Sequence, residues 1–228
     1  MTIRLFFCFN LLIIYSAVSA QFGLRAKYNS AEYNDWDQSL NKILHTDKNM
    51  LSSGLELGVD YWFKLKKRRI EFMPELSYSS AKTSYNLVEL ERISLSAFHF
   101  NFNTHIYALD MEGDCNCPTF SKQGTTINKG LFFHFTPGIS YNNLSTKTAI
   151  NSTHKQNFIS FKAGIGLGLD VGVSDLLTFT PIISYYFSST ATNDWFSATG
   201  VDTNPKLLQA SLRIGFRPDY GRSGRRRR

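Results

Sequence analysis

Two histidines in this sequence have the side-chain type and the spacing that could support proton transfer. His105 lies five residues before Asp110 and His134 lies five residues after Lys129, so equal arms flank one polar connector. If these arms pair as antiparallel strands, the two rings should lie roughly level. Imidazole beside a carboxylate can act in acid–base catalysis. No serine and carboxylate join them in an evident constellation near the far rim, so we expect both histidines to pack and hydrogen-bond inside the fold, with no catalytic residue.

The same connector carries the second reactive pair, Cys115 and Cys117, in a Cys-Asn-Cys-Pro motif. Two thiols are fewer than the four ligands of a usual structural zinc site, so we expect no metal and no cofactor. In an oxidising compartment the pair could close a small-loop disulfide, although this spacing strains the bridge. Free thiols, or pairing with a partner protein, are the alternatives.

An N-terminal secretory signal would carry the chain to such a compartment. Arg4 supplies a positive charge, residues 5–15 are apolar, and residues 18–20 form a small-residue cleavage sequence. This pattern predicts a signal peptide over residues 1–20 and a mature chain that begins at Gln21.

The elements that must position these groups are β-strands. Between residues 157 and 174, apolar side chains alternate with glycine, serine, lysine and aspartate almost without error. A period of two indicates a strand with one apolar and one polar face. Glycines on the polar face would make room for bulky neighbours inside a narrow closed barrel. We interpret the segment as a transmembrane strand with its apolar face toward lipid and its polar face toward the lumen.

Counting this segment, the alternation occurs in eight segments along the chain. They lie near residues 22–28, 51–64, 70–78, 93–109, 131–141, 157–174, 177–187 and 208–217. In the fourth segment, the apolar phase changes from Ile93 and Leu95 to Phe98, which predicts a β-bulge near Ala97. No apolar run reaches the length of a membrane helix, and without helices only a closed barrel can span a membrane.

The predicted fold class is therefore all-β, an eight-stranded antiparallel transmembrane β-barrel over residues 21–220 with long extracellular loops. A soluble lipocalin-like barrel would reverse the two faces. Three features favour the membrane form: nearly uninterrupted apolar faces, Gly- and Ser-rich polar faces, and an alternation of long and short connectors. The connector at 110–129 is the exception to this alternation, because it is long where a short one is expected. The formal net charge of +7 comes largely from a basic tail at 221–228, so we expect no nucleic-acid partner.

An eight-stranded barrel is just wide enough to be filled by its own side chains. The lumen-facing positions carry charges of both signs, and buried charges persist only when they are paired. We expect an interior salt-bridge network that plugs the barrel, with a gated small channel as the alternative. The expected members are Arg25, Lys27, Glu56, Asp60, Glu71, Glu75, Lys162, Asp170, Arg213 and Arg217.

The chain resembles the PorT-like family of Bacteroidota, which are small outer-membrane barrels of the OmpA/OmpX type. The resemblance rests on the connector CNCPTFSKQG, the KGLFFHFTPGISY that follows it, and the ending RIGFRPDY with its basic tail. The resemblance implies an outer-membrane location and a barrel in contact with outer-membrane lipid. The family name comes from a component of the type IX secretion and gliding apparatus, and that role does not transfer with the name.

The leading functional hypothesis is a non-enzymatic, monomeric surface or structural protein. Its loops at 29–49, 142–156 and 188–206, or its periplasmic side, would contact a protein partner. An accessory role in a type IX secretion or gliding apparatus is the alternative, and a lipid-modifying outer-membrane enzyme is a further one.

Overall fold

The computed structural model describes residues 21–32, 53–65, 68–84, 91–111, 126–147, 153–174, 176–190 and 206–216. Nearly all of them lie in strands. The strands are β1 (Phe22–Glu32), β2 (Ser53–Tyr61), β3 (Phe63–Lys64), β4 (Ile70–Ser84), β5 (Arg92–Ile106), β6 (Leu131–Lys147), β7 (Thr153–Leu169), β8 (Val171–Gly172), β9 (Leu177–Thr190) and β10 (Lys206–Phe216). A 3₁₀ turn, η1 (Ala108–Asp110), and a short helix, α3 (Thr126–Gly130), lie between β5 and β6.

The strands form one closed antiparallel barrel. β10 pairs with β9 on one side and with β1 on the other, in a register that runs from Phe22 opposite Phe216 to Glu32 opposite Lys206. β3 continues the register of β2 against β4, and β8 continues that of β7 against β9. The ten segments therefore make eight barrel strands, and the predicted all-β, eight-stranded antiparallel barrel is confirmed.

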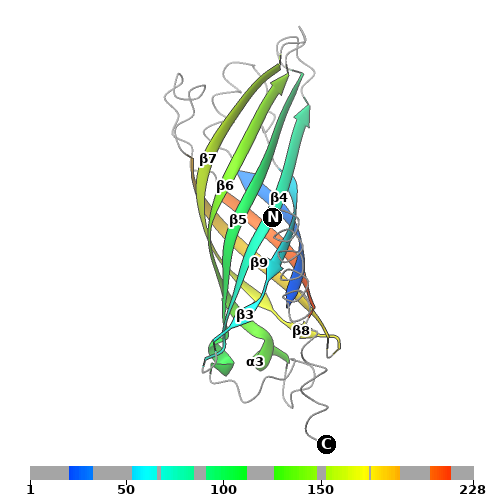
Figure 1. Ribbon diagram of the computed structural model, residues 1–228, viewed down its shortest axis with the longest axis vertical. Helices are drawn as coiled ribbons and strands as arrows, with labels where there is room; N and C mark the ends of the chain where they lie inside the picture. The colour runs from blue at the N-terminus through cyan, green and yellow to red at the C-terminus, as the bar shows by residue number, and fades with distance from the viewer. Residues whose placement is uncertain are drawn as a thin grey trace, which may run out of the picture.

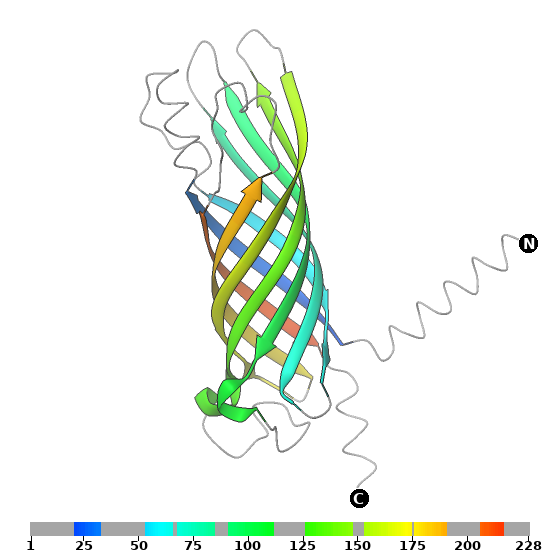
Figure 2. The same cartoon turned by 90° about the vertical axis from the view of Figure 1, so that its left-hand side faces the viewer.

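Four adjacent strands are taller than the others. β4 and β5 have 15 residues each and β6 and β7 have 17, whereas β1 and β10 have 11. Figures 1 and 2 show β4 to β7 rising as a wall beyond the ends of β1 and β10. The sequence interpretation placed loops at 79–91 and 142–156, but the described strands run to Ser84 and Lys147 and resume at Arg92 and Thr153. Similarly, β1 extends through 29–32 and β9 through 188–190, so those stretches are also strand.

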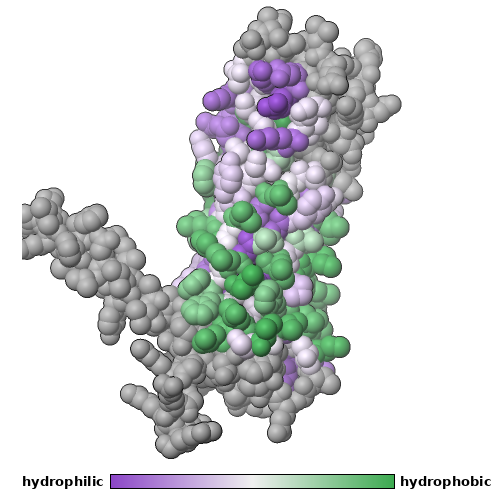
Figure 3. All heavy atoms as spheres, turned by 90° about the vertical axis from the view of Figure 1, so that its right-hand side faces the viewer, coloured by the Kyte–Doolittle hydropathy of each residue, from purple (hydrophilic) through white to green (hydrophobic). Residues whose placement is uncertain are grey.

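Away from this extension, the outer surface of the barrel is an apolar belt. Leu55, Leu57, Phe98, Phe161 and Ile183 are examples of its large, exposed hydrophobic side chains. Figure 3 shows green hydrophobic side chains gathered over the lower described surface and hydrophilic ones over the upper part. A contiguous apolar surface of this kind does not occur on ordinary soluble monomers, because it would be exposed to water.

The two faces exchange polarity where the tall strands leave the belt. Ile93 has no exposed surface and Leu144 is buried, so both point into the barrel, whereas Phe98 in the belt is 65% exposed and points outward. The β4–β5 register runs without interruption from Ile70 opposite Ile106 to Ser84 opposite Arg92. The expected bulge near Ala97 is therefore wrong. The apolar phase changes because the environment outside the barrel changes, while the backbone stays regular.

The opposite end of the barrel carries the beginning of β1, the end of β10 and the connections β3–β4 and β8–β9 (Figure 2). There, the buried side chains of Tyr107, Phe132 and Ile182 form an apolar cluster inside the barrel. Arg69 lies over the Tyr107 ring at 4.0 Å and pairs with Asp110 at 2.5 Å. Among the described residues, no helix is long and apolar enough to span a membrane.

Candidate functional site

The charged centre of the interior is built on three adjacent strands. Arg25 and Lys27 project inward from β1, because alternate residues of a strand share a face. The Nζ of Lys27 lies 2.7 Å from the Glu56 carboxylate of β2 and also pairs with Glu75 of β4. The Nε of Arg25 lies 2.8 Å from Asp60 and 3.4 Å from Glu75. All five side chains are almost fully buried, and each lies at contact distance from an opposite charge. This pairing compensates charges that would be costly to bury alone.

Arg213 brings β10 into the same cluster. Its Nη2 donates to Asp60 at 2.7 Å and its Nε donates to Asp60 at 2.8 Å, so two nitrogens of the guanidinium hydrogen-bond to the same carboxylate. β1 lies between β10 and β2, and its residue at this level is Gly23. A Cβ there would stand 2.6 Å from Arg213 Nε and 2.7 Å from Asp60 Oδ1. The ion pair can pass over β1 because this position has no side chain.

A second polar cluster lies nearer the end of the barrel that carries α3. The Tyr107 hydroxyl donates its proton to Asp170 at 2.5 Å, and its oxygen lies 3.2 Å from Glu71. Trp62 Nε1 donates to Glu71, and Thr180 donates to Asp170, each at 2.5 Å. These neutral donors satisfy hydrogen-bonding sites on two buried carboxylates.

His105 and His134 are register partners on β5 and β6, and both side chains are buried inside the barrel. Their ring centroids are 5.1 Å apart at 71°. His105 stacks on Phe132 at 3.9 Å, and a ring nitrogen of His134 lies 2.6 Å from the Thr136 hydroxyl. The two rings pack edge to face among the side chains that fill the barrel.

Four expected site residues are either outside the described part of the chain or without an ion pair within it. Lys162 points into the barrel, where its Nζ lies 5.6 Å over the Tyr186 ring, and no ion pair joins it within the described residues. Arg217, Cys115 and Cys117 fall outside the described residues, so the pairing of the cysteines stays a prediction. The described residues hold no group of three or more metal-ligating side chains.

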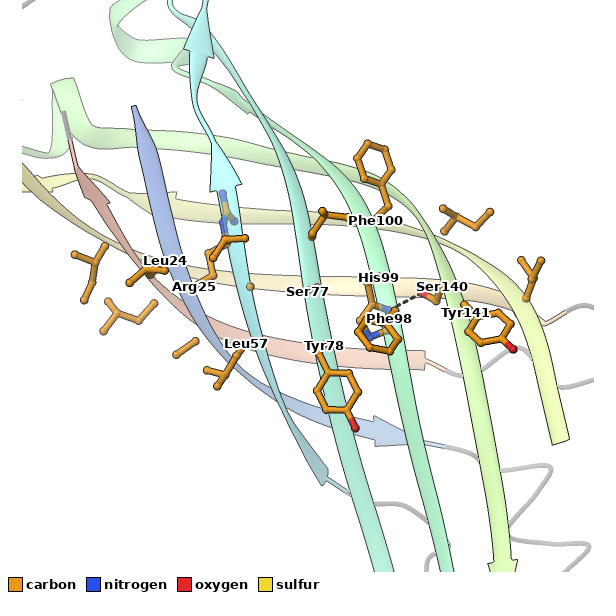
Figure 4. Close-up of a pocket in the computed structure, with 18 residues that line it drawn as sticks. Leu24, Arg25, Leu57, Ser77, Tyr78, Phe98, His99, Phe100, Ser140 and Tyr141 are labelled. Carbon is orange, nitrogen blue, oxygen red and sulfur yellow. Dashed lines mark hydrogen bonds between the residues drawn. The ribbon is translucent and has the colours of Figure 1, made fainter. Parts of the chain in front are cut away.

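Sequence reasoning missed a histidine site near the tall end of the lumen. His99 Nδ1 lies 2.6 Å from the Ser140 hydroxyl, and its Nε2 lies 2.8 Å from Ser79 (Figure 4 shows the contact with Ser140). Glu56 is 4.0 Å from Nε2. These side chains line an interior cavity of about 110 Å³ together with Lys162 and Tyr186. The inward phase of His99 could be read from the alternation, but its partners depend on strand register.

A serine hydroxyl bonded to an imidazole resembles the nucleophile and base of a hydrolase. Here, however, the imidazole nitrogen nearer the carboxylate is already bonded to Ser79. Ser140 is only 3% exposed, and the surrounding backbone belongs to the paired β5–β6 ladder. Acyl transfer needs free donors aimed at a developing oxyanion, which a complete ladder does not leave. The cluster is therefore arranged for hydrogen bonding rather than for nucleophilic catalysis.

The outer face carries a row of aromatic side chains at the upper edge of the belt. Tyr78, Phe98 and Tyr141 are register neighbours on β4, β5 and β6, and Ile159 on β7 completes the row. Figure 4 shows the three rings side by side on the outside of the strands. Together with belt residues of β1 and β2, they line a shallow apolar groove of about 860 Å³. Aromatic rings at this level are typical of membrane–water interfaces.

Comparisons with known proteins show no assigned family. No protein-family model matches the chain, and no curated protein matches it. Among solved structures, the chain is similar to Neisserial surface protein A (10% identity, 87% of this chain and 97% of that chain, TM-score 0.48). It is also similar to Ail of Yersinia pestis (10% identity, 87% and 97%, TM-score 0.45) and to the outer membrane protein OprG of Pseudomonas aeruginosa (12% identity, 87% and 94%, TM-score 0.39).

Proposed function

We propose that this chain is a bacterial outer-membrane β-barrel protein with a structural, plugged interior, and that its outer surface and extracellular end carry out its function. The observation that supports this most directly is the pairing of an exposed apolar belt with an interior of buried ion pairs. A soluble barrel would place these two kinds of side chain the other way round. In lipid, the belt is solvated by hydrocarbon and the charges are kept away from it.

The orientation follows from the connections. Outer-membrane barrels have short periplasmic turns and longer extracellular loops. Here, the β3–β4 and β8–β9 connections are short. The beginning of β1 and the end of β10 lie at the same end of the barrel as these two connections (Figure 2). We therefore place that end in the periplasm and the tall ends of β4 to β7 outside the cell. The proposed signal peptide at residues 1–20 lies outside the described residues and is part of this proposal.

The proposed role is non-enzymatic, with a protein partner at the extracellular end or on the periplasmic side, and the protein acts as a monomer. The completed hydrogen bonds of His99 support this over lipid modification. Membership of the PorT-like family, and with it an accessory role in a type IX secretion or gliding apparatus, is the alternative and rests on the sequence resemblance alone.

Membrane fractionation combined with gel mobility tests the location. A folded barrel should remain in the outer-membrane fraction and shift its mobility when it is boiled in detergent. Soluble protein in the periplasm with no heat-dependent shift would contradict the proposal. A deletion strain then separates the roles, since lost secretion of cargo favours the secretion apparatus and altered lipid A favours an enzyme. Pull-down from detergent extracts tests for the protein partner.

A further inference from the structure

We infer that the outward face of the four tall strands binds the phosphate groups of lipopolysaccharide in the surrounding outer leaflet. This inference rests on the proposed outer-membrane location. We call this face the basic platform. It comprises Ser80, Lys82, Ser84, Arg92, Ser94, Ser96, Asn143, Ser145, Lys147, Thr153, Lys155 and Asn157.

The strand register arranges the basic platform as three rows directly above the aromatic row. The first row is Ser80, Ser96, Asn143 and Asn157. The second row is Lys82, Ser94, Ser145 and Lys155. The third row is Ser84, Arg92, Lys147 and Thr153. All of these side chains have the same phase as Tyr78, Phe98 and Tyr141, so they face the lipid side of the wall rather than the lumen.

The platform is cationic and lacks the compensation seen inside the barrel. In the interior, Arg25, Lys27 and Arg213 each contact a carboxylate. On the platform, Lys82, Arg92 and Lys155 are exposed and make no ion pair within the described residues. Lys147 alone is paired, at 2.7 Å from Glu91, and its hydrogen bond lowers the pKa of that carboxyl. Among the described residues, the platform carries more positive than negative charge, and this excess favours an anionic ligand.

The position of the platform selects a lipid headgroup as that anion. Successive rows are about 6.8 Å apart along a strand, less in height because the strands tilt. The serine and asparagine row then lies just outside the aromatic row. Measured along the strands, Lys82 and Lys155 lie about 14 Å from the aromatic row and Arg92 lies about 20 Å from it. The polar zone of a bilayer begins at this level, where a flat wall that faces sideways meets the neighbouring lipids. Hydroxyl and amide groups suit sugar hydroxyls, and lysine and arginine suit phosphate.

The test uses the full chain, refolded into phosphatidylcholine vesicles that contain either bisphosphorylated lipid A or the same lipid A after dephosphorylation. After mild detergent extraction, native mass spectrometry counts the lipid A molecules retained per barrel. The test variant is Lys82→Ser/Arg92→Ser/Lys155→Ser. The matched control, Lys66→Ser/Lys67→Ser/Arg68→Ser, removes three cations from the segment between β3 and β4. Heat-dependent gel mobility is measured for every variant.

We expect the wild type and the control to retain the phosphorylated lipid in preference to the dephosphorylated one. We expect the test variant to lose this preference, with retention lower by about tenfold or more. Equal retention of the two lipids by the wild type, or unchanged retention by the test variant, would overturn the inference. Failure of the wild type to insert at all would instead contradict the proposed location.

Discussion

Arg213 and Asp60 form a two-nitrogen ion pair between β10 and β2, two strands that do not pair with each other. The contacts are 2.7 Å from Nη2 and 2.8 Å from Nε. Because β1 lies between them, the bond ties the last strand to the second strand across the closure of the barrel. Asp60 also accepts from Arg25 of β1, so one carboxylate joins three strands.

Asp60→Asn should therefore destabilise the barrel strongly. The substitution leaves two buried guanidinium groups without their shared anion, and removal of one member of a buried pair costs about 3–5 kcal/mol. Urea unfolding from lipid vesicles, followed by tryptophan fluorescence, measures the change. Glu91→Gln is the control, because its pair with Lys147 is exposed and should contribute little. Equal stability of the two variants would show that Asp60 does not secure the closure.

Gly23→Ala tests the passage over β1. The added Cβ would stand 2.6 Å from Arg213 Nε, so the guanidinium must move and the pair with Asp60 must lengthen. We expect a loss of about 1–3 kcal/mol in the free energy of unfolding. Gly54→Ala is the control, since its Cβ would approach other atoms no closer than 3.2 Å. If the mechanism is right, Gly23→Ala and Asp60→Asn together should cost less than the sum of the two. Additive costs would contradict it.

The exchange of faces above the belt makes a further prediction. Ile93 is fully buried within the tall wall, so Ile93→Ala should cost about 2–5 kcal/mol through lost burial and a residual cavity. Ser94→Ala, on the neighbouring outward position, should change stability little. The same vesicle unfolding assay compares them. A neutral Ile93→Ala would mean that the upper part of the barrel has no apolar interior of its own.

The sequence was sufficient to predict the fold where one rule held along a strand. Within the belt, apolar residues face out and polar residues face in, so alternation identified the strands and the inward phase of Arg25, Lys27 and Glu56. Above the belt, both sides are partly polar, and the periodicity of hydrophobicity weakens. For this reason, the sequence analysis assigned residues 79–84 and 142–147 to loops and interpreted the reversed apolar phase at Ile93 as a bulge.

The site was harder to predict than the fold because its contacts join side chains of different strands. Which side chains meet depends on the register between those strands. The interior position of His99 follows from alternation alone, but its contact with Ser140 requires the β5–β6 register. The pair between Asp60 and Arg213 requires the closing register of β10 on β1 as well. The equal arms around the connector predicted the β5–β6 register through His105 and His134, and the structure has that register. Nothing in the sequence indicated the closing register of β10 on β1, so the sequence analysis could name the charged residues without assigning their partners.

The position of the membrane boundary can be measured with arginine substitutions. Phe100 lies in the apolar belt on β5, whereas Ser96 lies beyond the aromatic row on the same strand and face. Arginine near the bilayer midplane costs about 2–4 kcal/mol and near the interface about 0–1 kcal/mol. We therefore expect Phe100→Arg to destabilise the reconstituted barrel and Ser96→Arg to be tolerated. A similar cost for both would place the boundary higher on the wall.

The last prediction concerns conductance. Lys27 contacts Glu56 and Glu75 across the middle of the barrel, and Arg25 and Arg213 meet at Asp60 close by. Since these side chains occupy the narrow lumen and their charges are paired, an ion would have to displace a compensated pair to pass. Planar-bilayer recordings of the wild type should show no large, stable, ion-selective steps. Lys27→Ala/Glu75→Ala removes a cation and a carboxylate together, so it opens space without changing the net charge of the interior, and Glu56 keeps its hydrogen bonds from Asn29, Ser77 and Gln209. We expect small conductance steps from this variant, while Lys82→Ala on the outer wall should leave the barrel closed. Large selective steps from the wild type would mean that the ion pairs line a pathway rather than block one.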